Sequence, residues 1–243
     1  MKAIDREKSQ KLYVQLFELL RNKIEAGKWP VGSQIPTEED LCKKYEVSKA
    51  TVRLAILELV RQGYLTRQQG KGTFICKRII PEGLTMLTSF KEIMLEAGIN
   101  FSTKILAQTV MMPTDDIDAK LNVPEDKHII YIKRLRLVDN EPILIQEAYI
   151  PYHICPQIMA EDIASNSLFD LFEKKFGLTI TKVKDNIEVS ACSADECRLL
   201  GLKEASPALL LEQYFYSGDV QIMYMRSIKH PDRFRFTIEF ERK

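Results

Sequence analysis

The sequence predicts a protein of the α+β class with two domains. Apolar residues recur with helical spacing through residues 12–62, and two short β-like segments follow at 64–76. Beyond residue 88, long pairs of strands alternate with short helices, the pattern of a mostly antiparallel sheet with helices packed on it. We therefore expect an N-terminal domain at 1–76, a linker at 77–87 and a larger C-terminal domain at 88–243.

Three helices are predicted in the N-terminal domain. The first covers residues 12–26, and Gly27 is a suitable stop signal. The second begins after Thr37, where Asp40 completes a capping-box pattern. The third begins after Ser48 and runs to about Gln62. Its apolar stripe, expected in the core, consists of Val52, Ala55, Ile56 and Leu59.

Basic and hydroxyl residues open the third helix, directly after a tight turn. Two helices joined in this way form a helix-turn-helix, whose second helix enters the major groove of DNA with its N-terminus first. Arg53 can donate two hydrogen bonds to guanine, and Lys49 can contact guanine or phosphate. Ser48 and Thr51 can donate to phosphate. The alternative is a surface helix with solvated cations, although Lys49 and Arg53 would repel each other mildly.

A predicted hairpin follows this helix at residues 64–76. Its turn contains Gly70, Lys71 and Gly72. The two glycines allow a close approach of the backbone, and Lys71 at the tip can enter the minor groove or contact phosphate. A hairpin beside a groove-reading helix is a wing, so the segment predicts a winged helix-turn-helix that binds double-stranded DNA.

Three motifs of this region resemble the DNA-binding domain of GntR-family transcription regulators. They are the loop GKWPVGSQIP at 27–36, the helix start VSKATVR at 47–53 and the wing GKGTF at 70–74. Three positions depart from the family pattern. Lys49 replaces the usual Arg and lacks its two-pronged geometry, which implies a different operator preference. Glu39 stands where a DNA-contacting Arg often occurs, and Glu46 stands where Gly is common.

The C-terminal domain is expected to alternate helices and strands. Two hairpins have their turns at Asp139–Asn140 and Gly218–Asp219. Further strands are expected at 102–113, 180–191 and 233–242, and helices at 88–98, 114–123, 167–177 and 193–201.

Arg134 and Arg136 are the chemically distinctive pair of this domain. They lie two residues apart in a predicted strand, so both side chains point to one face of the sheet. Two guanidinium groups on one face suit an anionic ligand such as a phosphate or carboxylate. The alternative is a structural role in which both arginines pair with carboxylates on that face.

Residues from about 80 to 243 are similar to the UTRA effector-binding domain of HutC-like GntR regulators, a fold related to chorismate lyase. The similarity is carried by LTSF, YIKRLRLVDNEP, EAYIP, SLFDLFE, SADECRLLGL and DRFRF. It implies that Arg134 and Arg136 contact the anion of an effector. It also implies effector contacts from Ser89, Phe90, Lys91 and Ser167.

Two positions depart from the pattern of related effector-binding domains. Gln146 stands where the strand before IP often has Glu, and Met223 stands where the last hairpin often has Glu. The loss of both acids makes the pocket less suited to an amine or to sugar hydroxyls. We therefore expect an anionic effector with fewer hydroxyl groups.

Charge and composition narrow the possible functional classes of the protein. Residues 1–78 carry 16 Lys and Arg against 9 Asp and Glu, whereas residues 79–243 carry 19 against 25, so the basic end suits a polyanion. Five scattered cysteines and three dispersed histidines form no metal or redox motif, and no cofactor is expected. No apolar run reaches the roughly 18 residues of a membrane span, and the N-terminus lacks a signal-peptide core, so we expect a cytoplasmic protein.

The combined expectation is a ligand-responsive DNA-binding regulator, acting as a repressor and as a homodimer on a palindromic operator. A ligand-independent DNA-binding protein is one alternative. An enzyme acting on a small anion is another, although the sequence contains no catalytic constellation.

Overall fold

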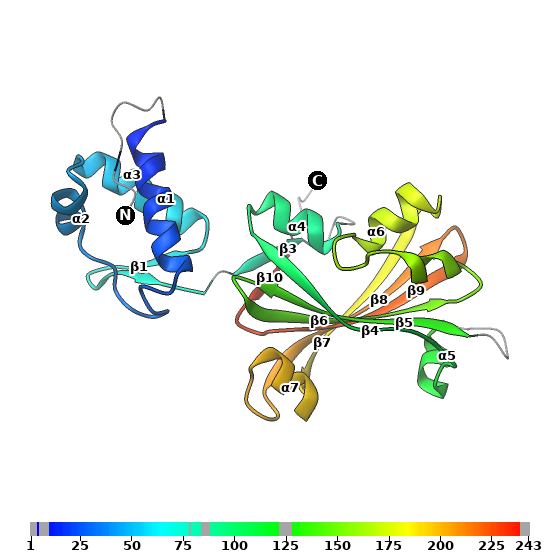
Figure 1. The fold of residues 1–243 in the computed structure, drawn as a ribbon. Helices are drawn as coiled ribbons and strands as arrows, with labels where there is room; N and C mark the ends of the chain where they lie inside the picture. Colours follow the sequence, from blue (N-terminus) through cyan, green and yellow to red (C-terminus); the bar gives the residue numbers. More distant parts are fainter. Residues whose placement is uncertain (1–3, 5–9, 78, 84–87, 122–127, 239–243) are drawn as a thin grey trace, which may run out of the picture. The chain divides into compact units, whose positions relative to one another are not determined.

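The computed structural model describes residues 4, 10–77, 79–83, 88–121 and 128–238 of the 243-residue chain. The chain divides into two compact units, Met1–Ile79 and Ile80–Lys243. Figure 1 shows a small helical unit and a larger unit built around a sheet. The predicted α+β class is confirmed.

The N-terminal unit contains three helices and one hairpin, as the sequence predicts. The helices are α1 (Leu12–Glu25), α2 (Glu38–Tyr45) and α3 (Lys49–Arg61), and the hairpin pairs β1 (Leu65–Gln68) with β2 (Gly72–Ile75). Thr37 and Asp40 form the expected capping box at α2, where the Asp40 backbone N–H donates to Thr37 Oγ1 at 3.2 Å. Ser48 caps α3 in the same way through the Thr51 backbone N–H.

One apolar cluster holds these elements together. The predicted stripe of α3 is buried in full and packs with residues of α1 and α2. Burial of each large apolar side chain contributes about 1.5–3 kcal/mol, so this cluster fixes the angle between α2 and α3. The members exposed by 2% or less are Leu16, Leu20, Leu41, Val52, Ala55, Ile56, Leu59, Leu65 and Ile75.

A six-stranded antiparallel sheet forms the centre of the C-terminal unit. Its strands lie in the order β4-β5-β6-β9-β8-β7. Their bounds are β4 Phe101–Met111, β5 Ile129–Val138, β6 Glu141–Pro151, β7 Lys182–Ala191, β8 Pro207–Ser217 and β9 Val220–Lys229. The two hairpins β5–β6 and β8–β9 turn at the predicted positions, and Asp139 and Asn140 both adopt positive φ angles.

Helices cover both faces of this sheet. Figure 1 shows α4 (Phe90–Glu96) and α6 (Leu168–Asp170) on one side, and α5 (Asp115–Leu121) and α7 (Ala194–Leu200) on the other. The helix expected at 167–177 is only one α-helical turn, and it continues as a π-helical segment, η2 (Leu171–Lys175). A 3₁₀ helix that no sequence pattern predicted, η1 (Pro156–Ala160), precedes it.

The segment expected to be a linker contains a strand. β3 (Ile80–Gly83) pairs in parallel with β10 (Phe234–Thr237), outside the six-stranded sheet. β10 is the described part of the strand expected at 233–242, whose last residues lie outside the described ranges. Lys229 contributes to this junction, because its buried ammonium group bonds with Glu82. The C-terminal unit therefore begins at Ile80 rather than at residue 88.

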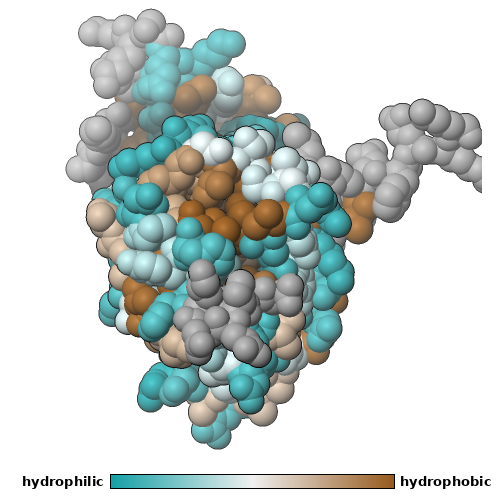
Figure 2. Space-filling model, turned by 90° about the vertical axis from the view of Figure 1, so that its right-hand side faces the viewer, coloured by the Kyte–Doolittle hydropathy of each residue, from teal (hydrophilic) through white to brown (hydrophobic). Residues whose placement is uncertain are grey.

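The face drawn in Figure 2 carries several groups of hydrophobic residues, and hydrophilic residues frame the largest of them. Exposed large hydrophobic residues of the C-terminal unit include Val110, Met112, Val189 and Val220. Within the described ranges, no helix is both long enough and apolar enough to cross a bilayer.

Candidate DNA-binding surface and anion site

The N-terminus of α3 is rigidly capped. Ser48 Oγ accepts a hydrogen bond from the Thr51 backbone N–H at 3.2 Å, and the two hydroxyl oxygens lie 2.9 Å apart. This cap fixes the direction in which the first helical turn presents its side chains. Lys49 and Arg53 lie on that turn and the next, and both are exposed. The structure thus places the four predicted DNA-contacting residues of α3 together on one exposed helix end.

Acidic residues of α2 form ion pairs with the basic residues of α3. Arg53 Nε donates to Glu38 Oε2 at 2.8 Å, and Glu38 Oε1 also lies 3.7 Å from Arg67 Nη2 in the hairpin. Lys49 Nζ lies 4.0 Å from Glu39 Oε1. The Arg53 side chain is nevertheless 62% exposed, and this bond uses Nε rather than its two terminal nitrogens. Sequence reasoning missed Glu38, because only the packing of α2 against α3 reveals the pairing.

The tip of the wing requires glycine at two positions. Gly70 and Gly72 have φ angles of +73° and +126°, which side chains rarely tolerate, and Gly72 also faces Gln34. A Cβ atom on Gly72 would lie 2.2 Å from Gln34 Nε2, which donates to the Lys71 carbonyl at 3.2 Å. Gly72 therefore serves contact within the domain, and Lys71 remains exposed at the tip.

Arg134 and Arg136 are both buried inside the C-terminal unit. Their exposed fractions are 2% and 4%, and they share one neutral acceptor, Gln146 Oε1. Arg134 Nη2 donates to that oxygen at 2.6 Å and Arg136 Nη2 at 3.3 Å. Arg136 Nη1 also donates to Thr103 Oγ1 at 2.5 Å. The predicted pairing of both side chains on one sheet face is therefore present.

No carboxylate of the described residues forms an ion pair with either guanidinium. The Nε atoms of Arg134 and Arg136 are buried without a hydrogen-bond partner among those residues. Burial, reinforced by the neighbouring Arg136 charge, lowers the pKa of Arg134 well below its ordinary value, and burial lowers the pKa of Arg136 to about 10. The structural alternative, in which carboxylates neutralise both arginines, finds no support here. Two buried cations without counterions form a ready site for an anion.

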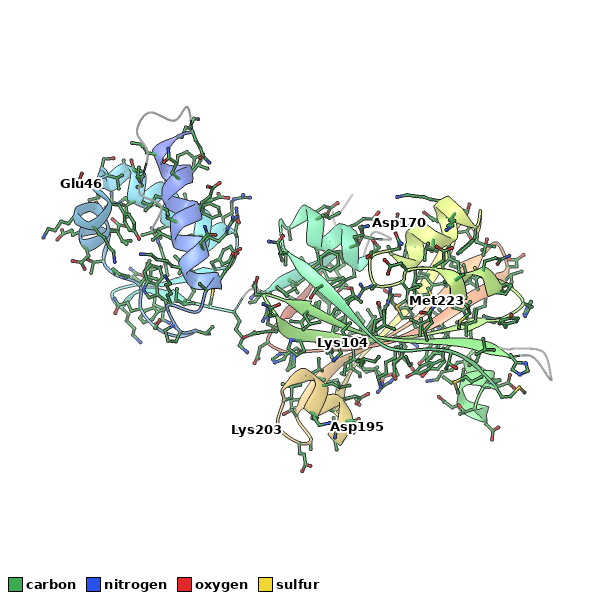
Figure 3. The ribbon with its side chains drawn as sticks, viewed as in Figure 1. Glu46, Lys104, Asp170, Asp195, Lys203 and Met223 are labelled. Carbon is green, nitrogen blue, oxygen red and sulfur yellow. The ribbon has the colours of Figure 1, made fainter. Side chains whose placement is uncertain are left out.

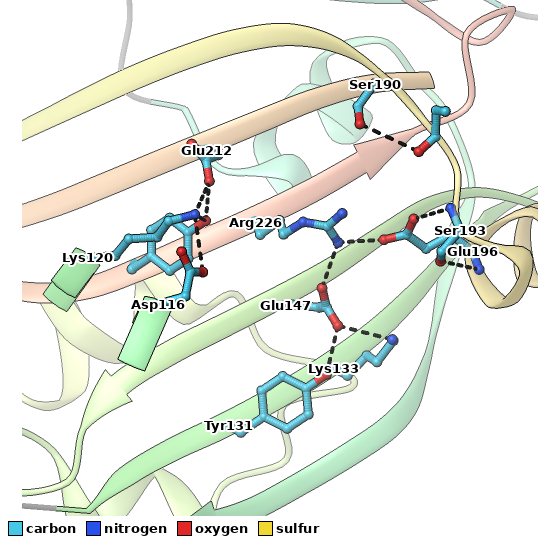
Figure 4. A network of polar contacts seen from close by, with 12 residues as sticks. Asp116, Lys120, Tyr131, Lys133, Glu147, Ser190, Ser193, Glu196, Glu212 and Arg226 are labelled. Atoms are coloured by element: carbon cyan, nitrogen blue, oxygen red, sulfur yellow. Dashed lines mark hydrogen bonds and ion pairs between the residues drawn. The ribbon is translucent and has the colours of Figure 1, made fainter. Parts of the chain in front are cut away.

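The opposite face of the same sheet is organised differently (Figure 4). There Arg226 Nη1 donates to Glu147 Oε2 at 3.0 Å and to Glu196 Oε1 at 2.5 Å. Glu147 also accepts from Tyr131 Oη at 2.7 Å and lies 3.0 Å from Lys133 Nζ. Burial opposes the charge of Glu147, but these donors outweigh it and lower its pKa. Within the described part of the chain, Arg226 is therefore paired with two carboxylates, unlike Arg134 and Arg136.

The other predicted effector residues contribute unequally. Phe90 contacts the site directly, since its ring centroid lies 5.0 Å from Arg136 Cζ. Ser89 is buried, but its backbone N–H donates to Glu92 Oε2 at 2.7 Å in a capping box, so that amide is occupied. Lys91 is half-buried on α4, and Ser167 is buried at the start of α6. Neither is among the described hydrogen-bond partners of the two guanidinium groups.

Two further features of the site were not predicted. Thr103 accepts from Arg136 because β4 and β5 place these residues opposite each other, a register that the sequence does not reveal. Met223, the second position lacking an acid, is fully buried in the hydrophobic cluster beneath α6 (Figure 3). Its side chain fills the core and offers no acceptor to a ligand.

Comparisons with known proteins agree with this architecture. Residues 12–75 match the bacterial regulatory proteins of the gntR family, and residues 96–235 match the UTRA domain. The chain is 27% identical to the HTH-type transcriptional repressor NagR of Bacillus subtilis over 98% of both chains. It is 28% identical to the probable fructoselysine utilization operon transcriptional repressor of Escherichia coli K12 over the full length of both.

A solved structure shows the same fold. The crystal structure of PhnF from Mycobacterium smegmatis superimposes with a TM-score of 0.72 at 24% identity, covering 93% of this chain and 99% of that one. The capped helix, the wing, the six-stranded sheet and the matched families lead to one conclusion: this chain belongs to the gntR family of bacterial transcription regulators, with a DNA-binding N-terminal domain and a UTRA effector-binding domain.

Proposed function

We propose that this regulator is a homodimeric, cytoplasmic repressor whose two winged helices bind a palindromic operator. Its effector is a small phosphomonoester bound between Arg134 and Arg136. The observation that carries the proposal is the pair of buried guanidinium groups with a neutral Gln146, and no carboxylate of the described residues, between them. In such a dimer the two groove-reading helices would lie about 34–36 Å apart, one turn of DNA.

Charge balance favours a dianion. Each unpaired buried cation carries a desolvation penalty of several kcal/mol, which only an opposite charge in the site can offset. A carboxylate monoanion would neutralise one guanidinium and leave the other. A phosphomonoester carries between one and two negative charges at neutral pH and three terminal oxygens for forked hydrogen bonds. The two arginines therefore select for phosphate over carboxylate.

The rest of the effector is expected to be poor in hydroxyl groups. Gln146 Oε1 is already used by both arginines, and Met223 is part of the core. Neither position accepts hydrogen bonds from sugar hydroxyls. The Escherichia coli relative named for fructoselysine utilization supports a sugar-derived compound, whereas these two positions favour one with fewer hydroxyl contacts.

Regulation requires that the effector bind the DNA-free and DNA-bound forms with different affinities. Thermal-shift and DNA-anisotropy measurements with inorganic phosphate, glycerol phosphate, hexose phosphates, hexosamine phosphates and the unphosphorylated sugars test the proposal. We expect phosphorylated compounds alone to raise the melting temperature and to change operator affinity. Equal shifts from unphosphorylated sugars would refute the phosphate site, and a shift from hexosamine phosphates alone would refute weak hydroxyl recognition.

Variants make the same test residue-specific. Arg134→Met and Arg136→Met should abolish the thermal shift while leaving the fold intact, since removal of an unpaired buried charge is often neutral or stabilising. Arg198→Met is the matched control, because Arg198 is exposed and lies on α7. DNA affinity that no compound changes would instead indicate a ligand-independent DNA-binding protein.

A further inference from the structure

β7 is an unusually open edge of the six-stranded sheet. It is ten residues long and pairs with β8 along its whole length without a register shift. Two apolar residues on it face solvent, Val189 at 74% and Ile187 at 39% exposure. Among the described hydrophobic clusters, only Val183 of this strand takes part. A long, regular edge with exposed apolar side chains is a template for pairing with another strand.

The other edge of the sheet is protected. β4 carries a register shift between Ile105 and Ala107, which disrupts a regular ladder. The Gln108 side chain also donates to the carbonyl of Met159 in η1 at 3.2 Å, so a neighbouring segment lies against this strand. The two edges therefore differ, and β7 alone combines length, regularity and exposed apolar residues.

We propose that β7 pairs antiparallel with β7 of a second copy of this chain, about a twofold axis at Asn186. The two six-stranded sheets then form one continuous sheet across the dimer. The inference rests on the homodimer proposed above and names the surface that forms it. Main-chain hydrogen bonds supply the affinity of such an edge pairing, and opposed side chains fix its register.

Charge selects the register. Around Asn186, Lys184 lies opposite Glu188 of the second copy, and the symmetry creates this pair twice. Neither residue has an ion-pair partner among the described residues, and both are exposed. On the other face, the same register sets Val183 against Val189 of the second copy, which would cover the most exposed apolar residue of the strand.

Neighbouring registers are less favourable. Only registers that keep side chains on matching faces are possible, so the axis moves from Asn186 to Asp185 or Ile187. An axis at Asp185 sets Lys182 against Glu188, but it also sets the two Asp185 carboxylates directly against each other. An axis at Ile187 sets Lys184 against Ser190, and it forms no opposite-charge pair. Of these three axes, the one at Asn186 alone forms an opposite-charge pair without setting like charges against each other.

Charge exchange tests the pairing. Lys184→Glu and Glu188→Lys should each raise the dimer dissociation constant at least tenfold in analytical ultracentrifugation of the full chain. The double variant Lys184→Glu/Glu188→Lys should restore the dimer, which separates lost pairing from lost folding. Lys203→Glu and Glu204→Lys, at an exposed loop after α7, are the matched controls and should leave the dissociation constant unchanged.

Cross-linking tests the axis. In this register, the Cα atoms of the two Asn186 residues lie about 4.5–5.5 Å apart, within disulfide range. Asn186→Cys should therefore form covalent dimers under mild oxidation far faster than Asp185→Cys, Ile187→Cys or the parent chain with its five free cysteines. A stable dimer that neither cross-links at 186 nor responds to charge exchange would overturn this inference alone. A parent chain that is monomeric at every concentration would overturn the proposed homodimer as well.

Discussion

The substitution Gln146→Glu tests whether Arg134, Arg136 and Gln146 form an anion-binding site or only a structural polar cluster. In the ligand-free protein it places a carboxylate where an amide oxygen now lies, 2.6 Å from Arg134 Nη2 and 3.3 Å from Arg136 Nη2. At an effective dielectric constant near 20, a unit charge pair about 4 Å apart gains about 4 kcal/mol before desolvation. Desolvation of the new carboxylate offsets part of this gain, so we expect a net stabilisation of about 1–2 kcal/mol. The melting temperature should then rise by about 2–8 °C.

The same substitution should weaken effector binding. A ligand phosphate held by both guanidinium groups would lie about 6 Å from the new carboxylate, where the repulsion is about 3 kcal/mol per ligand charge. Because 1.4 kcal/mol corresponds to a factor of ten, we expect affinity for phosphomonoesters to fall at least 100-fold. Isothermal titration calorimetry measures this directly, and a melting curve of the same sample reports the stability.

The control is Gln146→Met, which has similar volume and no charge. It removes the shared acceptor without neutralising either arginine, so the melting temperature should not rise. If Gln146→Glu binds phosphomonoesters as tightly as the parent chain, the charge-balance reasoning is wrong. If its melting temperature falls, the two arginines are not the unpaired cations that the structure shows.

Four further outcomes follow from other contacts. Arg53→Ala should reduce discrimination at one operator base pair by about 1–3 kcal/mol in gel shifts against variant operators, and an unchanged sequence profile would exclude Arg53 as a base reader. Glu38→Gln, which removes the carboxylate that competes for Arg53, should tighten DNA binding several-fold in fluorescence anisotropy. Glu46→Gly should stabilise the N-terminal unit by about 0.5–1 kcal/mol in urea unfolding, because Glu46 has a φ angle of 53°. The pKa of Glu147 is lowered in the folded protein, so its charged form contributes stability above the ordinary pKa of 4.5, and this stability is lost as the pH falls through the folded-state pKa. Glu147→Gln should therefore lower the melting temperature at pH 7. The difference from the parent chain should shrink below about pH 4.5.

Local signals predicted most of the fold. Thr37 and Ser48 cap the helices that follow them, and the turn at Asp139–Asn140 joins the expected strands. Each of these features depends on residues within one turn of the chain, so the sequence carries the whole signal. The strand β3 and its parallel partner β10 were not predicted as a pair, because about 150 residues separate them in the chain. The segment expected to be a linker therefore includes the strand β3.

The candidate sites were predicted less completely than the fold. The same-face placement of Arg134 and Arg136 follows from strand geometry alone and is confirmed. That no carboxylate of the described residues pairs with them depends on which residues the neighbouring strands place opposite them, and no local pattern encodes that register. Likewise, Glu38 binds Arg53 across fifteen residues through the packing of α2 on α3. Sequence patterns thus predicted the residue types at the sites, and tertiary contacts decided which groups lie against them.

Two features of the C-terminal unit, the buried pair Arg134 and Arg136 and the exposed edge strand β7, are not explained by stability and call for a functional explanation. A buried arginine without a counterion is less stable than a well-packed apolar residue of similar volume, and total stability is only about 5–15 kcal/mol. Among the described residues, two arginines on one sheet face have no counterion, although on the other face Arg226 is paired with two carboxylates. The edge strand β7 similarly exposes Val189 on a regular ladder, although β4 is interrupted at the opposite edge. The same sheet also contains an arginine paired with carboxylates, Arg226, and an interrupted edge strand, β4. The fold itself therefore does not force either feature. The two proposed partners, a small dianion at the arginines and another copy of the chain at the edge strand, would account for these features.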